Sequence, residues 1–354
     1  MDKEGGVKDM KIVIVGPGAI GCAVAASISE ENTEVFLLGR ERHKEYFKKN
    51  PVLYKTYNGN RSSKVEAITI DDLKKGHITP DAIFITLKAN PTLAFAEELQ
   101  DILPKETPII SLQNGFVAQD IYDKTKFENV YPCVIGFNVL LEDIGVALQT
   151  TDGDIIVGKL TRDISPEKGK DIPKFILNAL SKTAPTSISN NIVSDVWMKV
   201  MINCTINPIC AIGNFALGEI PSDISGLTLA LWTWKELIHV VDALGIKLNP
   251  FQGQLYPEML YNYDLISFGI ARTVVTRMTR DNKDAIVSML QDIRNNKTTE
   301  IDYLNGKVVE LGKEHGVKMP VNEILINTIK KLEKGELKPS KGLINKLYNQ
   351  IVLS

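Results

Sequence analysis

The sequence predicts an N-terminal α/β domain built on a doubly wound parallel sheet, followed by an all-helical C-terminal domain. Three observations support this fold class. Short apolar runs alternate with amphipathic segments in the first half of the chain, a glycine-rich turn follows the first run, and strand-like patterns almost vanish beyond about residue 191. The chain has 354 residues, a length typical of roughly two domains. We therefore expect domains at residues 1–190 and 191–354.

Four apolar runs predict the parallel sheet of the first domain. Each is rich in Ile, Val, Leu or Phe, as is typical of strands buried on both faces. The runs are Lys11–Val15, Glu34–Leu38, Ala82–Thr86 and Pro108–Leu112. Helical patterns occupy Ala19–Ser29, Thr92–Leu103 and Val117–Lys124. This βαβα order favours a doubly wound sheet, and strand-like pieces between 130 and 157 predict a β-rich end of the same domain.

The second domain is predicted from long segments with helical spacing that end at or near glycine, as helix C-termini often do. These segments are Asn191–Gly213, Leu227–Leu244, Thr298–Gly312 and Val321–Gly335. The segment Gln252–Tyr263 is turn-rich and irregular. A helical domain with this much apolar surface permits a homodimer without demanding one.

The composition argues against several kinds of partner. The formal net charge is −2, so the chain lacks the basic excess typical of nucleic-acid binding. The four cysteines have no CxxC spacing and the four histidines are scattered, so we expect no metal site and four buried, reduced thiols. No secretory signal is apparent, and the most hydrophobic stretch, Val196–Leu217, contains a lysine, amides and a proline. We therefore expect a cytoplasmic protein without a membrane partner.

A glycine motif directly after the first predicted strand indicates a dinucleotide site. It consists of Gly16, Pro17, Gly18, Ala19, Ile20 and Gly21. In a GxGxxG motif the first glycine permits a tight turn, the second lets the backbone approach a pyrophosphate, and the third lets helix and strand pack closely. The start of the helix then offers free N–H groups to the phosphates. This pattern predicts a Rossmann-type domain.

Arg40 indicates which dinucleotide is bound. It follows the second predicted strand, about 20 residues beyond the last glycine, where an NAD-specific fold usually has a carboxylate for the ribose 2′-hydroxyl. An arginine there can hold a 2′-phosphate instead, which favours NADP(H). Glu41 follows Arg40 directly, so in an alternative register a carboxylate occupies the position that faces the ribose. The simpler alternative is that Arg40 is a solvated charge in a loop.

A narrow polar stripe interrupts an otherwise apolar predicted helix. Lys199, Asn203 and Asn207 are spaced four residues apart, so they fall within about 80° of one another on a helix of about 3.6 residues per turn. Pro208 should kink the helix or end a turn, freeing backbone acceptors. The stripe predicts side chains facing a wet cleft, although a snorkelling lysine with two amides bonded inside the core would give the same pattern. Burial would lower the pKa of Lys199, as a proton donor at neutral pH requires.

A second polar cluster lies between residues 288 and 303. Ser288 and Gln291 fit the S-x-x-Q capping pattern, which predicts a helix N-cap at Ser288. Glu300 lies near the start of the following predicted helix, where a carboxylate interacts favourably with the helix dipole. These patterns alone indicate nothing beyond helix capping.

Together these segments resemble the ketopantoate reductase (2-dehydropantoate 2-reductase) family along nearly the whole chain. Besides the glycine turn, the motifs that carry the resemblance are Thr86-Leu-Lys88-Ala, Leu112-Gln-Asn114-Gly115, Lys199-x3-Asn203-x3-Asn207-Pro208, Ser288-Met-Leu-Gln-Asp-Ile-Arg and Thr299-Glu300-Ile-Asp-Tyr-Leu-Asn-Gly306. The last is the most specific. The resemblance implies NADPH-dependent reduction of a 2-keto acid, 2-dehydropantoate, to pantoate for pantothenate biosynthesis, in a cleft between the domains.

The resemblance also implies roles for individual residues. Lys199 matches the general acid, whose ammonium stabilises the developing alkoxide and supplies its proton. Asn203 and Asn207 match groups that bind substrate hydroxyl and carbonyl oxygens, and Ser288 matches a hydroxyl bound to the substrate carboxylate. Glu300 matches a catalytic carboxylate that orients the lysine and contacts the cofactor side.

Two further positions match cofactor contacts of that family. Lys88 and Asn114 lie at the ends of predicted strands, where an open α/β sheet presents its ligand site. The resemblance places both against the cofactor, and Asn114 against the substrate as well.

The chain also departs from the family pattern. Leu217 stands before a Gly-Glu pair where the family usually has a substrate-binding asparagine, and leucine cannot donate a hydrogen bond. The stretch from Leu217 to Ser288 is longer than in compact members, and the chain continues to Ser354. Two alternatives therefore stay open: a related reductase of another branched 2-keto acid, and a non-catalytic NADP-binding sensor. A sensor, however, needs no lysine on an apolar helix.

Overall fold

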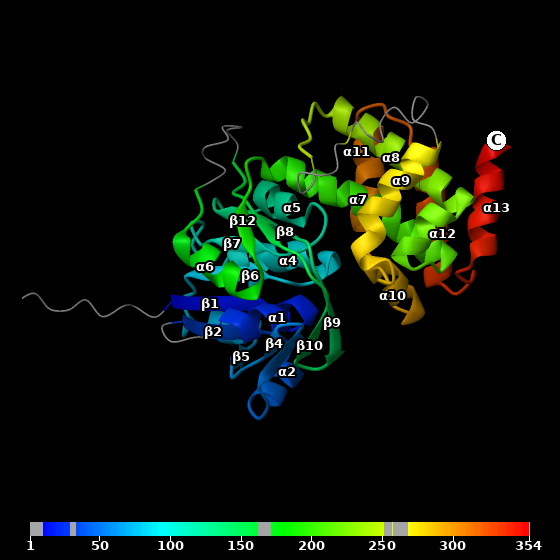
Figure 1. The fold of residues 1–354 in the computed structure, drawn as a ribbon. Coiled ribbons are helices and arrows are strands. Elements are labelled where there is room, and N and C mark those ends of the chain that lie inside the picture. Colours follow the sequence, from blue (N-terminus) through cyan, green and yellow to red (C-terminus); the bar gives the residue numbers. More distant parts are fainter. Residues whose placement is uncertain (1–9, 29–32, 162–170, 251–256, 258–267, 354) are drawn as a thin grey trace, which may run out of the picture. The chain divides into compact units, whose positions relative to one another are not determined.

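The computed structural model describes residues 10–28, 33–161, 171–250, 257 and 268–353, and the chain divides into two compact units (Figure 1). Unit 1 comprises Met1–Val193 and unit 2 comprises Ser194–Ser354. Most of the irregular segment Gln252–Tyr263 lies outside the described residues.

Unit 1 is built on an eight-stranded sheet with the order β12-β11-β8-β7-β6-β1-β2-β5. Every pairing is parallel except that of β8 with β11. The strands are β1 (Met10–Val15), β2 (Thr33–Leu38), β5 (Glu66–Ile68), β6 (Ala82–Ile85), β7 (Ile109–Ser111), β8 (Val130–Ile135), β11 (Ile155–Val157) and β12 (Thr186–Ile188). The four predicted apolar runs are β1, β2, β6 and β7, so the predicted parallel sheet is confirmed.

A second, four-stranded sheet has the order β4-β3-β10-β9. Its strands are β3 (Val52–Thr56), β4 (Gly59–Ser63), β9 (Asn138–Asp143) and β10 (Val146–Thr151). The β-rich stretch after residue 130 is confirmed: β8 and β11 belong to the first sheet, and β9 and β10 belong to this second sheet. The pairing of β3 with β10 joins segments almost a hundred residues apart, which local pattern cannot reveal.

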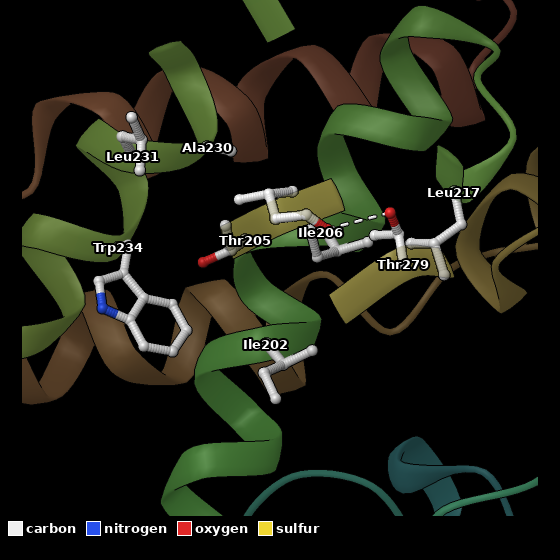
Figure 2. A pocket seen from close by; sticks show the side chains of 9 residues that line it. Ile202, Thr205, Ile206, Leu217, Ala230, Leu231, Trp234 and Thr279 are labelled. Carbon is white, nitrogen blue, oxygen red and sulfur yellow. Dashed lines mark hydrogen bonds between the residues drawn. The ribbon is translucent and has the colours of Figure 1, made fainter. Parts of the chain in front are cut away.

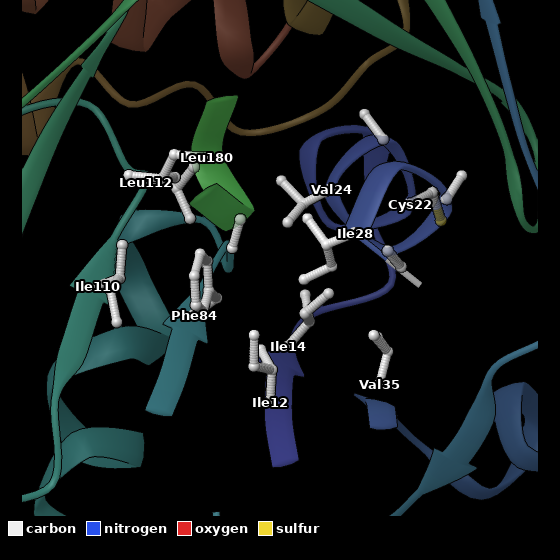
Figure 3. Close-up of a cluster of buried hydrophobic side chains, with 14 of the residues drawn as sticks. Ile12, Ile14, Cys22, Val24, Ile28, Val35, Phe84, Ile110, Leu112 and Leu180 are labelled. Atoms are coloured by element: carbon white, nitrogen blue, oxygen red, sulfur yellow. The ribbon is translucent and has the colours of Figure 1, made fainter. Parts of the chain in front are cut away.

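Helices cover the sheets of unit 1. They are α1 (Ala19–Ile28), α2 (Glu41–Phe47), α3 (Ile70–Lys74), α4 (Ala89–Gln100), α5 (Val117–Lys124) and α6 (Lys174–Thr183). Helix α1 contacts β1 and β2 of the first sheet, β3 and β10 of the second, and α6. It is buried from Gly21 to Ile28, which explains why its sequence is apolar on every side. Figure 3 shows Val24 and Ile28 of α1 packed toward Ile12 and Ile14 of β1.

The described part of unit 2 is entirely helical, as predicted. Its elements are α7 (Ile192–Gly213), the 3₁₀ turn η2 (Leu217–Ser222), α8 (Ile224–Ala243), α9 (Phe268–Thr279), the 3₁₀ turn η4 (Arg280–Asn282), α10 (Ser288–Arg294), the π-turn η5 (Asp302–Gly306), α11 (Lys307–Glu314), α12 (Pro320–Glu333) and α13 (Lys341–Val352). Helix α13, which the sequence analysis did not predict, packs on α8, where the rings of Trp232 and Tyr348 stack 5.8 Å apart.

Two predicted details of unit 2 were wrong. The predicted helix Thr298–Gly312 opens as the π-turn η5 and becomes α-helical only at Lys307. Ser288 is not the N-cap of α10, because Val287 occupies that position and Ser288 is the first helical residue. Pro208 does not end α7, which runs on to Gly213, and the kink stays a prediction.

The glycine turn gives a stability prediction with a built-in control. A Cβ added at Gly21 would lie 2.0 Å from the Gly16 carbonyl oxygen, whereas one added at Gly18 meets no atom within 4 Å. We expect Gly21→Ala to lower the free energy of unfolding by about 2 kcal/mol or more, because backbone atoms must move apart. Gly18→Ala should change it by less than about 0.5 kcal/mol. Urea denaturation of both variants checks this; equal effects would contradict the close packing at Gly21.

Candidate active site

Unit 1 gathers the predicted cofactor residues at the carboxyl ends of adjacent strands. In the sheet order, β7, β6, β1 and β2 are neighbours. The chain leaves β1 through α1 to β2 on one side, while β6 pairs with β1 on the other side. The carboxyl end of β1 is therefore the topological switch point, where open α/β sheets bind their ligands.

The glycine motif occupies this switch point and fits a bound pyrophosphate. Gly16 takes a φ of +105°, and its N–H donates to the Leu38 carbonyl at 3.0 Å, which ties the turn to the end of β2. Ala19 is the first residue of α1, so the N–H groups of the first helical turn face the motif's loop. The space beside Gly18 is open. A diphosphate could approach the backbone there without displacing a side chain.

Two residues without an assigned role fasten the neighbouring loops together. The Thr86 hydroxyl, just after β6, lies 2.9 Å from the Val15 carbonyl oxygen and 2.8 Å from that of Gly16. The Gln113 amide, after β7, donates to the Leu87 carbonyl at 2.6 Å and to the Thr92 hydroxyl at 2.5 Å. The three loops that follow β1, β6 and β7 therefore form one hydrogen-bonded edge. Both residues lie in motifs that carry the family resemblance, but no pattern in the sequence gave either of them a role.

Arg40, Lys88 and Asn114 are exposed at this same edge. Arg40 precedes α2, Lys88 is the N-cap residue of α4, and Asn114 follows β7. The Arg40 N–H donates to Nδ1 of His43 at 3.0 Å, which holds the loop after β2 in place. Burial lowers the pKa of His43, and the nearby charges of Arg42 and Arg40 lower it further, which favours the neutral ring that can accept this hydrogen bond.

The polar stripe of unit 2 lies on α7. Lys199 is half-buried, whereas Asn203 and Asn207 are buried. Burial lowers the pKa of Lys199 below its ordinary value, because an ammonium is poorly solvated among apolar neighbours. Both interpretations of the stripe, as a ligand-facing row and as bonded core residues, are compatible with this burial. The lowered pKa is the property that a proton donor near neutral pH needs.

Pro208 frees one backbone acceptor in the middle of this helix, as its missing N–H predicts. The carbonyl that residue 208 would otherwise bind is that of Cys204, four residues earlier. The Asn305 side-chain amide of η5 donates to this carbonyl at 2.9 Å and to the Asn322 side-chain oxygen, also at 2.9 Å. Asn305 therefore fastens the motif that contains Glu300 to α7, in the turn between Asn203 and Asn207.

The same network reaches the two helices behind α7. The Glu236 carboxylate of α8 accepts from the Val321 N–H at 2.8 Å, and from the backbone and side-chain nitrogens of Asn322 at 3.0 and 2.7 Å. Burial raises the pKa of Glu236, while the hydrogen bonds from Asn322 and Val321 lower it in part. Helices α8 and α12 and the turn η5 are thus held together by buried polar groups behind the polar stripe.

Further hydrogen bonds place the segments that carry Ser288 and Glu300. The guanidinium of Arg294, at the end of α10, donates to the Asn214 side-chain oxygen at 2.8 and 3.2 Å, next to the end of α7. The backbone and hydroxyl of Thr299 donate to Glu333 at 2.8 and 2.7 Å. Ser288 is exposed and Glu300 is half-buried. These bonds anchor α10 and the turn before η5 to the rest of unit 2.

Two further features of the described residues bear on the site. Within the described residues, no group of three or more His, Cys, Asp or Glu side chains is placed to hold a metal ion, and the four cysteines are buried and free. One described helix, Ile192–Gly213, is long and apolar enough to cross a membrane by length and composition, and 78% of the tested stretch is buried inside the structure.

The glycine turn at the switch point is typical of a dinucleotide-binding domain, and unit 2 carries a half-buried lysine on an apolar helix. Comparison with known families agrees. The ketopantoate reductase PanE/ApbA family matches residues 12–162, and its C-terminal region matches residues 191–333. The chain therefore belongs to the ketopantoate reductase family and is a nicotinamide-dependent oxidoreductase.

The match to individual relatives spans nearly the whole length of both proteins. The 2-dehydropantoate 2-reductase of Pyrococcus horikoshii is 28% identical over 329 residues, which are 92% of this chain and 98% of the relative. The enzyme of the same name from Escherichia coli O157:H7 is 26% identical over 334 residues, 92% of this chain and 95% of the relative.

Solved structures share the fold. A PanE/ApbA family ketopantoate reductase from Ralstonia eutropha JMP134 superposes with a TM-score of 0.75 at 21% identity, covering 92% of this chain and 99% of the other. D-mandelate dehydrogenase, solved with NADH and anilino(oxo)acetate, superposes with a TM-score of 0.74 at 22% identity, covering the same shares of both chains.

The bond between Asn305 and α7 gives a second stability prediction. Asn305→Ala leaves the Cys204 carbonyl and the Asn322 side-chain oxygen without this donor in a buried setting, so we expect a loss of about 2–3 kcal/mol in the free energy of unfolding. Asn349→Ala, at an exposed position of α13, is the matched control and should cost less than about 0.5 kcal/mol. Urea denaturation measures both. A small, equal effect would show that Asn305 does not fasten α7.

Proposed function

We propose that this chain is an NADPH-dependent 2-dehydropantoate 2-reductase, which reduces the 2-keto group of 2-dehydropantoate to the hydroxyl of pantoate in pantothenate biosynthesis. The observation that carries the proposal is a lysine of lowered pKa in a polar stripe on the buried helix α7. The names of the relatives from Pyrococcus horikoshii and Escherichia coli support the choice of substrate. The substrates are small soluble metabolites, so a cytoplasmic location is part of the proposal.

Unit 1 residues bind the cofactor in this proposal. The turn from Gly16 to Gly21 and the start of α1 hold the pyrophosphate, because the space beside Gly18 is open and the helix offers N–H groups. Arg40 binds the 2′-phosphate that distinguishes NADPH from NADH. Lys88 and Asn114 contact the cofactor from the loops after β6 and β7. The cofactor, when bound, supplies a hydride to the keto carbon.

In this proposal, residues of unit 2 stabilise the developing charge, donate the proton and bind the substrate. As the keto carbon is reduced, negative charge develops on its oxygen, and the Lys199 ammonium stabilises that charge and donates a proton to the oxygen. Asn203 and Asn207 bind the polar oxygens of the substrate, together with Asn114 of unit 1. Ser288 binds the substrate carboxylate. Glu300 orients the Lys199 ammonium and contacts the cofactor side.

The role of Lys199 can be tested by removing its charge. We expect Lys199→Met to lower kcat for 2-dehydropantoate reduction by about 100-fold or more, since general acids contribute on this scale. The Kd for NADPH, measured by fluorescence titration, should stay within about twofold. Lys334→Met removes a lysine at an exposed position after α12 and should leave kcat unchanged. A Lys199→Met enzyme with near-normal kcat would refute the proton-donor role.

Arg40 is tested by comparing the two cofactors. We expect Arg40→Ala to raise the KM for NADPH about tenfold or more while changing the KM for NADH little, because only NADPH carries the 2′-phosphate. Arg42→Ala removes an equally exposed guanidinium two residues away and should affect neither KM by more than about twofold. Equal weakening of both cofactors by Arg40→Ala would contradict its assignment.

A further inference from the structure

An apolar pocket lies in unit 2 against one face of α7 (Figure 2). We call it the side pocket. Its volume is about 100 Å³, the liquid volume of roughly three water molecules. It is lined by residues of α7, α8 and α9 and by the first residue of η2, among them Ile202, Ile206, Leu217, Leu231, Trp234 and Val275. Figure 2 shows Trp234 and Leu231 on one side of Ile206, and Leu217 and Thr279 on the other.

The wall of the side pocket is hydrocarbon, even where lining residues carry polar atoms. The Thr279 hydroxyl is turned to its own helix, where it donates to the Val275 carbonyl at 3.0 Å. Thr205 Oγ1 and Trp234 Nε1 are buried atoms without a hydrogen-bond partner in the described part of the chain, so they add almost no accessible polar surface. A pocket with such a wall favours an apolar occupant over water.

The side pocket borders the polar stripe along α7. Ile202 follows Lys199 by three residues, and Ile206 follows Asn203 by three. Side chains three positions apart on a helix are surface neighbours, about 5–6 Å apart at their Cβ atoms. The side chains of Ile202 and Ile206, which line the pocket, are therefore neighbours of Lys199 and Asn203 on the surface of α7.

Leu217 is held at the edge of the pocket by its backbone. Its N–H donates to the Ala285 carbonyl at 3.0 Å, and the next N–H, of Gly218, donates to the Lys283 carbonyl at 2.8 Å. A Cβ at Gly218 would lie 2.6 Å from Lys283, so this approach depends on glycine. The leucine side chain at this fixed position offers a substrate apolar contact and no hydrogen bond.

We propose that the side pocket receives the branched aliphatic side chain of a 2-keto acid, and that the chain reduces such acids at least as efficiently as 2-dehydropantoate. This inference rests on the proposed 2-keto acid reductase function. The reaction is the same as in that function. Hydride from the reduced nicotinamide reaches the keto carbon and a proton reaches its oxygen, giving a 2-hydroxy acid and the oxidised cofactor. The size and hydrocarbon wall of the pocket suit the isobutyl group of 4-methyl-2-oxopentanoate better than the side chain of 2-dehydropantoate, whose branched carbon carries a polar hydroxymethyl group.

The test compares kcat/KM for 4-methyl-2-oxopentanoate, 2-dehydropantoate and pyruvate with NADPH. The wild-type chain should reduce 4-methyl-2-oxopentanoate with a kcat/KM equal to or above that for 2-dehydropantoate. Ala230→Leu narrows the pocket and should lower kcat/KM for the branched acid at least tenfold more than for pyruvate, whose methyl group is too short to enter. Ala243→Leu, at an exposed position of the same helix, is the matched control and should change neither.

A second variant keeps the test decisive if Ala230→Leu folds poorly. Leu217→Asn should raise kcat/KM for 2-dehydropantoate and lower it for the branched acid. If the wild-type chain prefers 2-dehydropantoate, or if the pocket variants affect all three acids equally, the side-pocket inference is overturned while the proposed function stands. If the wild-type chain reduces none of the three acids, the proposed function itself fails.

Discussion

An ammonium on a buried helix is energetically costly, and this cost is the main constraint on how unit 2 is packed. Helix α7 is apolar nearly all round, and a charge held there loses much of its hydration, which lowers the pKa of Lys199. Such a group is useful only if the helix that carries it stays fixed. Asn305 holds the helix by donating to the Cys204 carbonyl, which Pro208 leaves free. Asn305 also donates to Asn322 of α12, and Asn322 donates to Glu236 of α8.

Unit 1 has a different constraint, because a dinucleotide is bound mainly by backbone N–H groups and by side chains in the loops after the strands. The glycine turn provides open backbone, and its shape depends on neighbours: Thr86 binds the turn from β6, and Gln113 joins the loops after β6 and β7. Both side chains shape the site indirectly, by bonding the backbone carbonyls of the loops that form it. In both units, polar residues adjacent to the predicted site residues fix the geometry of the site.

Much of the fold could be predicted from local pattern, because β1, β2, β6 and β7 each contain a short apolar run that is buried. Strand β4, with the sequence GNRSS, could not, since it is a strand only through its pairing with β3. The partner of the Cys204 carbonyl lies 101 residues away, so local sequence gives no sign of it. The π-turn η5 was likewise missed, because its apolar spacing resembles that of an ordinary helix. Lys199, Asn203 and Asn207 became candidates because polar side chains at helical spacing on an apolar helix are conspicuous. Ser288 and Glu300 became candidates only through the family resemblance.

The most direct test of the account is the ionisation of Lys199 itself. Its Nζ can be followed by ¹⁵N NMR titration of the lysine-labelled protein and assigned by the signal that disappears in Lys199→Arg. A desolvated ammonium at this position should titrate below the usual lysine pKa of about 10.4. A Lys199 pKa at or above 10.4 would contradict a desolvated ammonium on α7 and the proton transfer assigned to it.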